Sequence, residues 1–145
     1  MSTKEILVLE DAPNWQRDLK ALLEKAGYSV KIASNLSEAF QVLKVGNIKV
    51  AVVDLSLVPG DAKDRQGREF INLVRTPVVC VSGYLSPGES SELSTETRAK
   101  WVFDKGTFSE KRATFLEAVG LAMLASEAEI RARWREIERW LGSGD

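Results

Sequence analysis

Four short, mainly apolar runs in this chain are each followed by a charged or hydroxyl-bearing residue, and this pattern constrains the fold more than any other feature. The runs cover residues 6–9, 50–53, 78–81 and 101–104. Apolar runs of this length are typical of strands that are buried on both faces, as in parallel sheets. Helical patterns lie between the runs, and such alternation predicts right-handed crossovers around one parallel sheet. We therefore expect an α/β fold with a doubly wound, five-stranded parallel sheet.

The boundaries of the expected elements follow from proline, glycine and the apolar spacing. Pro13 suits the first turn of a helix, where its missing N–H is not needed, and Gly27 suits a left-handed helix stop. The expected strands are residues 6–9, 29–33, 50–54, 77–82 and one that ends near 105, and the expected helices are residues 13–26, 36–44, 68–74 and 88–98.

The C-terminal segment departs from this alternation. Between residues 109 and 141 only Gly120 interrupts a helical pattern, which makes this helix longer than usual. Its first half must cover the sheet, so we expect a domain at residues 1–125 and a helical extension at residues 126–145. In the extension an apolar stripe recurs at helical spacing, in Ile130, Trp134, Ile137 and Leu141. We expect a homodimer through paired C-terminal helices, with back-folding onto the domain or a link to a further output domain as alternatives.

Composition excludes several classes of function. The chain contains no histidine, which excludes Ser-His-Asp and Cys-His catalysis, histidine metal ligands and a phosphohistidine on this chain. A net charge of -1 gives no reason to expect a nucleic-acid or membrane partner, and no apolar run is as long as a membrane span or resembles a signal peptide. The only cysteine, Cys80, lies in an expected core strand, so no internal disulfide can form and we predict a cytoplasmic location.

Five polar side chains are expected at one edge of the sheet, because the carboxyl ends of parallel strands lie together and ligands bind there. Glu10 and Asp11 follow the first run, Asp54 the second, Ser82 the third and Lys105 the fourth. Carboxylates suit Mg²⁺, and a carboxylate can accept a phosphoryl group to give an aspartyl phosphate. A lysine can neutralise the developing charge, and a hydroxyl can hydrogen-bond a phosphate oxygen. The sequence therefore predicts a site for a divalent cation and a phosphoryl group.

The order and separation of these residues resemble the receiver domain of two-component response regulators, over about residues 4–125. The motifs are "LVLEDAPNW" with the acidic pair, "VAVVDLSL" with Asp54, "VVCVSGY" with Ser82 and "WVFDKG" with Lys105. Each motif alone is weak, but the four in this order, within the alternating pattern, are specific. The resemblance implies the flavodoxin-like form of the doubly wound sheet, with the last helix extended.

By this resemblance Asp54 would be the phosphoacceptor, taking its phosphoryl group from a phosphohistidine of a sensor histidine kinase or phosphotransfer protein. Asp11, Asp54 and the backbone carbonyl of Ser56 would bind Mg²⁺, and Glu10 would act through water. Phosphorylation would switch the conformation of the domain. Such a protein is not a conventional enzyme, since its chemistry is self-phosphorylation from a phosphodonor and slow autodephosphorylation.

The resemblance also implies that Lys105 pairs with the phosphoryl group and that Ser82 turns toward it as the switch hydroxyl.

Three features depart from the family pattern. Gly106 stands where receivers usually have a proline in a cis bond, so we expect a trans bond or a reshaped loop there. The switch aromatic would fall on Val102. The loop at residues 55–67 is about five residues longer than is typical, and loops of this size are often functional.

Rival functions differ in the residues they require. A dehalogenase-type phosphatase needs a second aspartate two residues after Asp54, where Ser56 stands, and a nucleotide-binding fold would have glycines after the first strand. The remaining alternative is a pseudo-receiver that keeps the fold but acts as a non-phosphorylated binding or scaffold module; Gly106 and Val102 favour it. We interpret Trp15 as a helix-packing residue.

Overall fold

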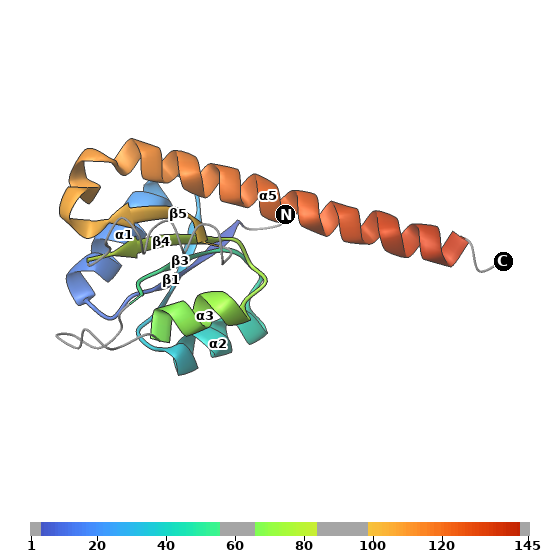
Figure 1. Cartoon of the computed structure of the whole chain (residues 1–145), viewed down its shortest axis with the longest axis horizontal. Helices are drawn as coiled ribbons and strands as arrows, with labels where there is room; N and C mark the ends of the chain where they lie inside the picture. The colour runs from blue at the N-terminus through green and yellow to red at the C-terminus, as the bar shows by residue number, and fades with distance from the viewer. Residues whose placement is uncertain (1–3, 56–65, 84–98, 143–145) are drawn as a thin grey trace.

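Five parallel strands form one sheet in the order β2-β1-β3-β4-β5 (Figure 1). The computed structural model describes residues 4–55, 66–83 and 99–142, and every structural statement below refers to these ranges. The strands are β1 (Glu5–Leu9), β2 (Ser29–Ala33), β3 (Ile48–Val53), β4 (Val78–Ser82) and β5 (Ala99–Asp104), and the helices are α1 (Pro13–Lys25), α2 (Leu36–Val45), α3 (Gln66–Leu73), the 3₁₀ helix η1 (Lys105–Glu110) and α5 (Arg112–Gly142).

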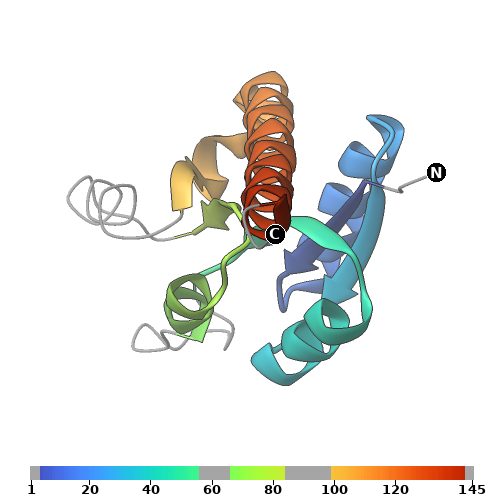
Figure 2. The ribbon, with the colours of Figure 1, turned by 90° about the vertical axis from the view of Figure 1, so that its right-hand side faces the viewer.

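Helices cover both faces of the sheet, so the predicted doubly wound, flavodoxin-like fold is confirmed. Successive residues of β1 point to opposite faces: Ile6 and Val8 pack with α1 and α5, whereas Leu7 and Leu9 pack with α2 and α3. Figure 2 shows α5 lying over one side of the sheet, with α2 and α3 on the other. Because β1 lies between β2 and β3, the strand order reverses beside β1, which is where open α/β sheets bind ligands.

The local signals read from the sequence fix the helix ends. Pro13 is the first residue of α1, and Gly27, just beyond its end, has φ of 99°, in the left-handed region that glycine adopts without strain. The side chain of Asn35 caps α2 by accepting a hydrogen bond from the Glu38 N–H at 2.9 Å. Pro13 and Gly27 therefore stand at the two ends of α1, as the sequence predicts.

Some predicted boundaries differ from the structure. The third helix begins at Gln66, not at residue 68, and the last α-helix begins at Arg112, not at residue 109, because η1 comes before it. The Asp104 side chain caps η1 by accepting a hydrogen bond from the Gly106 N–H at 2.9 Å, which starts a turn before α5. The predicted helix at residues 88–98 and most of the long loop at residues 55–67 lie outside the described ranges.

Helix α5 is one continuous element of 31 residues. Its first half is anchored in the core, where the buried residues are Phe115, Ala118, Val119, Ala122, Met123 and Ser126. Its second half extends away from the domain (Figure 1), and residues 128–142 are all exposed. The extension therefore does not fold back onto the described part of its own domain. Within the described ranges, no helix combines the length and apolar character that a membrane span needs.

Candidate functional site

The acidic pair lies directly after β1, at the carboxyl edge of the sheet. The backbone N–H of Glu10 donates to the Ala33 carbonyl at 3.0 Å, which extends the β1–β2 ladder by one residue and fixes the position of the pair. The Glu10 side chain is buried, with 1% of the residue exposed, and its Oε1 accepts a hydrogen bond from the Ala12 N–H at 3.1 Å. The Gln16 side-chain amide donates to the Glu10 carbonyl, so α1 also holds this residue in place.

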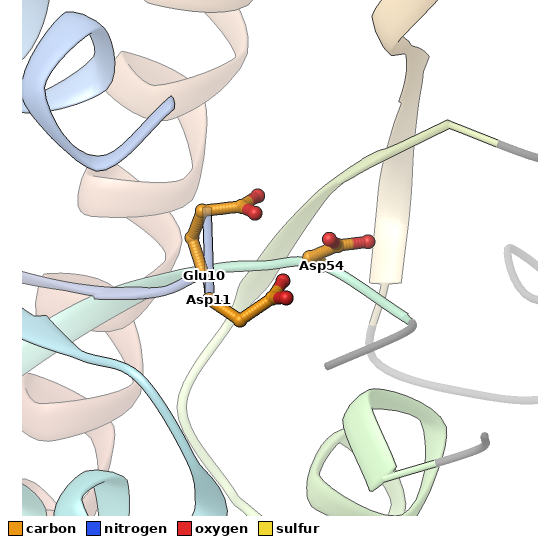
Figure 3. A group of neighbouring side chains, drawn as sticks. All are labelled: Glu10, Asp11 and Asp54. Carbon is orange, nitrogen blue, oxygen red and sulfur yellow. The ribbon is translucent and has the colours of Figure 1, made fainter. Parts of the chain in front are cut away.

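Asp54 follows β3 and lies opposite the acidic pair. Its N–H donates to the Leu9 carbonyl at 2.9 Å, so β1 positions this residue as well. Figure 3 shows Glu10 and Asp11 extending from the end of β1 toward Asp54. The three residues each offer a carboxylate oxygen, and these oxygens all lie within 4.8 Å of one another. Three carboxylates converge here because the sheet brings the ends of β1 and β3 side by side.

Lys105 provides the positive charge of the site. It directly follows the carboxyl end of β5. Its Nζ lies 2.8 Å from Glu10 Oε2 and 3.0 Å from Asp54 Oδ2, and only 16% of the side chain is exposed. The ammonium thus bridges two buried carboxylates, one that follows β1 and one that follows β3. Charge-assisted contacts of this length are strong where water is excluded, so Lys105 balances part of the negative charge.

The ionisation of these groups reflects burial and mutual charge. Burial of the Glu10 carboxyl, and then the negative charge of Asp54, raise the pKa of Glu10 to about 7, although Lys105 and the Ala12 N–H oppose this rise. Burial alone would lower the pKa of Lys105, but the hydrogen bonds and charges of Glu10 and Asp54 more than offset burial and raise it. Lys105 therefore stays positive at neutral pH, while Glu10 can carry a proton near neutral pH.

The two remaining residues expected at the site are Ser82 and Ser56. Ser82 is the last residue of β4 and is buried, and it pairs in register with Asp104, the residue before Lys105. Its hydroxyl therefore lies at the same sheet edge as the lysine. Ser56, expected to offer a backbone carbonyl to a metal, lies outside the described ranges.

Two departures from the family pattern can be seen in β5 and η1. No cis peptide occurs in the described residues, so the Lys105–Gly106 bond is trans, as expected when glycine replaces proline. Val102 is half-buried and packs with the core on the α2 and α3 side of the sheet, whereas Trp101 and Phe103 pack on the α1 and α5 side. The face of β5 that carries Val102 therefore presents an aliphatic side chain where receivers carry an aromatic one.

Trp15 and Gly67 also contact residues of the site, and the sequence pattern does not predict these contacts. The Lys105 ammonium lies over the ring of Trp15, 5.0 Å from its centre. Gly67 in α3 lies against the backbone that follows β3: its N–H donates to the Leu55 carbonyl at 3.1 Å, and an added Cβ would collide with the Asp54 carbonyl oxygen. A tryptophan four residues after Asp11 and a glycine after a loop are common, so neither pattern marks a site without the fold.

The donor set fits a small, hard divalent cation. Mg²⁺ prefers carboxylate and other oxygen ligands, usually one or two carboxylates with waters and phosphate oxygens. Asp11 and Asp54 offer carboxylate oxygens within this cluster, whereas Lys105 and the Ala12 N–H occupy the two oxygens of Glu10. The carboxylates of Asp11 and Asp54 are therefore suited to hold such an ion.

Comparisons with known proteins place this fold among signalling domains. No family model and no curated protein matches the sequence. A CheY-like response regulator receiver domain protein from Methanospirillum hungatei JF-1 is 25% identical, with a TM-score of 0.72, over 88% of this chain and 99% of that chain. A response regulator from Thermotoga maritima is 22% identical, with a TM-score of 0.69, over 84% of this chain and 98% of that one.

The similarity also extends over the long C-terminal helix. A fusion protein that carries a trimeric coiled-coil segment of yeast Spc42 is 24% identical to this chain, with a TM-score of 0.69, and the match covers 99% of this chain and 96% of that one. The receiver matches cover the five-stranded sheet of this chain, which carries the acidic cluster after β1 and β3 and the lysine after β5. The chain therefore has the fold of the CheY-like response regulator receiver domains that it resembles, and its last helix continues as a long extension.

Proposed function

We propose that Asp54 accepts a phosphoryl group from a phosphohistidine of a sensor histidine kinase or phosphotransfer protein. The observation that carries this proposal is the bridge from Lys105 to Asp54, at 3.0 Å, beside the acidic pair. A purely structural ion pair would need one carboxylate, whereas three converge here and Lys105 contacts two of them. This excess of negative charge at a sheet edge is costly for the fold and suits a site that binds a cation and transfers phosphate.

The transfer is a displacement at phosphorus. A carboxylate oxygen of Asp54 forms a bond to phosphorus while the bond from phosphorus to the partner's imidazole nitrogen breaks, and that nitrogen keeps the electron pair. Lys105 is held beside Asp54 and stabilises the negative charge that develops on the phosphoryl oxygens. The Ser82 hydroxyl, at the same sheet edge, donates a hydrogen bond to a phosphoryl oxygen as the switch residue.

The site also requires Mg²⁺ in this proposal. Asp11 and Asp54 would hold the ion together with the backbone carbonyl of Ser56, and Glu10 would contact it through water. The two hydrogen-bonded oxygens of Glu10 support this indirect role, because both already have partners within the protein. When bound there, Mg²⁺ would supply positive charge that offsets the negative charge of the carboxylates and of the phosphoryl group. The same chain slowly hydrolyses its own aspartyl phosphate, and we place this chemistry in the cytoplasm.

A labelling experiment tests the proposal. The full chain is incubated with acetyl phosphate and Mg²⁺, and the mass of the intact protein is measured. We expect a gain of one phosphoryl group in the wild type, and none in Asp54→Asn or after chelation of Mg²⁺. Asp18→Asn is the matched control, since Asp18 is an exposed aspartate on α1, away from the cluster.

The result also separates this function from its alternative. A pseudo-receiver that acts as a scaffold would keep the fold and show no mass gain in any variant. Val102 in place of the switch aromatic is the observation that favours this second function. If Asp54→Asn is labelled as well as the wild type, a different residue is the acceptor and the assignment of Asp54 is wrong.

A further inference from the structure

The second half of α5 leaves its domain and presents an apolar stripe to solvent. Ser126 is the last buried residue of the helix, and Glu127 forms an ion pair with Lys4 at 4.0 Å. At 1.5 Å per residue, residues 127–142 continue for about 24 Å. The stripe consists of large side chains that are between 41% and 61% exposed: Ile130, Trp134, Ile137 and Leu141.

The spacing of the stripe is that of a helix–helix seam. The four residues follow one another at intervals of four, three and four, which is the alternation of the two apolar positions of a heptad. They therefore lie on one face, and the opposite face carries small or charged residues such as Ala132 and Arg139. A seam of this kind is complete only when another helix covers it.

The place of the stripe on α5 decides which way a second helix can run. Met123 is buried against the sheet and precedes Ile130 by seven residues, and residues seven apart differ in direction by only about 20°. The face that carries the stripe is thus the face that, two turns earlier, is covered by the domain. A partner helix running parallel along this face would run into the domain that covers the first half of α5, whereas an antiparallel helix keeps the two domains at opposite ends.

The flanking side chains suit an antiparallel pair of identical helices. If Ile130 lies opposite Leu141 of the partner subunit, Trp134 lies opposite Ile137 of the partner subunit, and the same contacts repeat by symmetry. On one side of this seam Arg131 then faces Glu138 of the partner subunit, an opposite-charge pair. On the other side Arg133 faces Trp140 of the partner subunit, a cation with an aromatic ring.

From the continuity of the stripe with the core face and from these flanking pairs, we infer that two copies of this chain associate through an antiparallel pair of C-terminal helices, with Ile130, Trp134, Ile137 and Leu141 as the seam. In this dimer the end of each α5 approaches the domain of the partner, so the apolar face of each helix is covered first by its own domain and then by the partner's helix. The inference does not depend on phosphorylation of Asp54.

Sedimentation of full-length protein without phosphodonor or Mg²⁺ tests the surface. We expect wild type to be dimeric at tens of micromolar, and Ile137→Glu to raise the dissociation constant at least tenfold, because it places a charge in the seam. Ala132→Glu is the matched control, since it adds the same charge on the opposite face, and it should leave the dimer unchanged. A wild type that is monomeric at high micromolar concentration, or an Ile137→Glu variant that associates like wild type, would overturn the inference.

Oxidative cross-linking tests the direction, with Ile130→Cys and Leu141→Cys as single variants. In the antiparallel dimer the two variants cross-link when mixed, and Ile130→Cys does not cross-link to itself. Self-cross-linking of Ile130→Cys would show a parallel pair and overturn the proposed geometry. The native Cys80 is fully buried in β4, so the wild type serves as the negative control.

Discussion

The ammonium group of Lys105 lies over the indole ring of Trp15, 5.0 Å from the ring centre. The same ring meets Phe108 edge-on at 5.5 Å, so Trp15 both packs, as the sequence suggested, and supports the lysine. Lys105 thus has a defined position before any phosphoryl group arrives, fixed by two carboxylates and one aromatic face.

The first prediction concerns Trp15→Ala. A partly buried cation–π contact contributes about 0.5 to 2 kcal/mol, so we expect the rate of phosphorylation by acetyl phosphate to fall by about tenfold as Lys105 loses its support. Trp15→Phe keeps an aromatic face and should recover most of the rate. If Trp15→Ala is phosphorylated as fast as wild type, the ring does not position the lysine.

The second prediction concerns Gly67→Ala. An added Cβ would lie 2.6 Å from the Leu55 Cα and would also collide with the Asp54 carbonyl oxygen, so the backbone beside Asp54 must move. We expect urea unfolding to show a loss of roughly 1 to 3 kcal/mol, together with reduced labelling of Asp54. Gly142→Ala is the control, because its Cβ would meet no atom within 4 Å. Equal stability of the two variants would contradict the close approach.

The third prediction concerns Asp11→Asn. Removing one of three neighbouring carboxylates relieves repulsion, so the metal-free variant should melt higher than wild type, by about 3 °C for each kcal/mol relieved. The same substitution removes a proposed Mg²⁺ ligand, so Mg²⁺ should raise the melting temperature of the wild type but not that of the variant. A full response to Mg²⁺ in Asp11→Asn would exclude Asp11 as a ligand, and Asp18→Asn controls for the change in net charge.

The fourth prediction is a dependence of stability on pH that arises from Glu10. Its pKa is about 7 in the folded protein, raised by burial and by Asp54, against an ordinary value of 4.5. Because the folded state holds this proton more tightly, the resulting stability is complete below about pH 4.5 and is lost as the pH rises through 7. The loss is on the order of 3 kcal/mol. Lys105 does not contribute to this slope, since its raised pKa keeps it charged throughout.

Urea unfolding of metal-free protein between pH 5 and 8 measures this slope. The side chain of Glu10→Gln cannot ionise, so the free energy of unfolding of this variant should change less with pH over this range. The variant should also be more stable than wild type at pH 8. Parallel curves for the two proteins would show that Glu10 ionises in the folded state as it does in the unfolded chain.

The sheet and the charged cluster were predictable because they depend on strand ends. Apolar runs mark strands, and parallel strands bring the residues that follow them to one edge; Glu10, Asp54 and Lys105 therefore meet although they lie far apart in sequence. The sequence pattern starts the last helix at residue 109, three residues before α5 begins. The reason is the 3₁₀ turn that the Asp104 side chain caps, because such a turn leaves no periodic pattern in the sequence.

The supporting residues could not be predicted in the same way. Whether the ring of Trp15 faces Lys105 depends on how α1 lies against η1, which is a tertiary relationship. The close approach of Gly67 to Asp54 depends on how α3 docks beside β3. A single sequence shows that a glycine is present, but the surrounding backbone shows why a larger residue would not fit.

Because α5 is a single uninterrupted helix, it works mechanically as a rigid arm. Phe115, in its first turn, packs against Phe108 at 5.0 Å, and Phe108 in turn meets Trp15 beneath Lys105. A tilt of about 10° near Ser126 would carry Leu141 about 4 Å sideways, since the 15 residues between them span about 22 Å. A small change of direction where the helix leaves the core would thus become a displacement of about 4 Å at the tip, enough to realign side chains packed there.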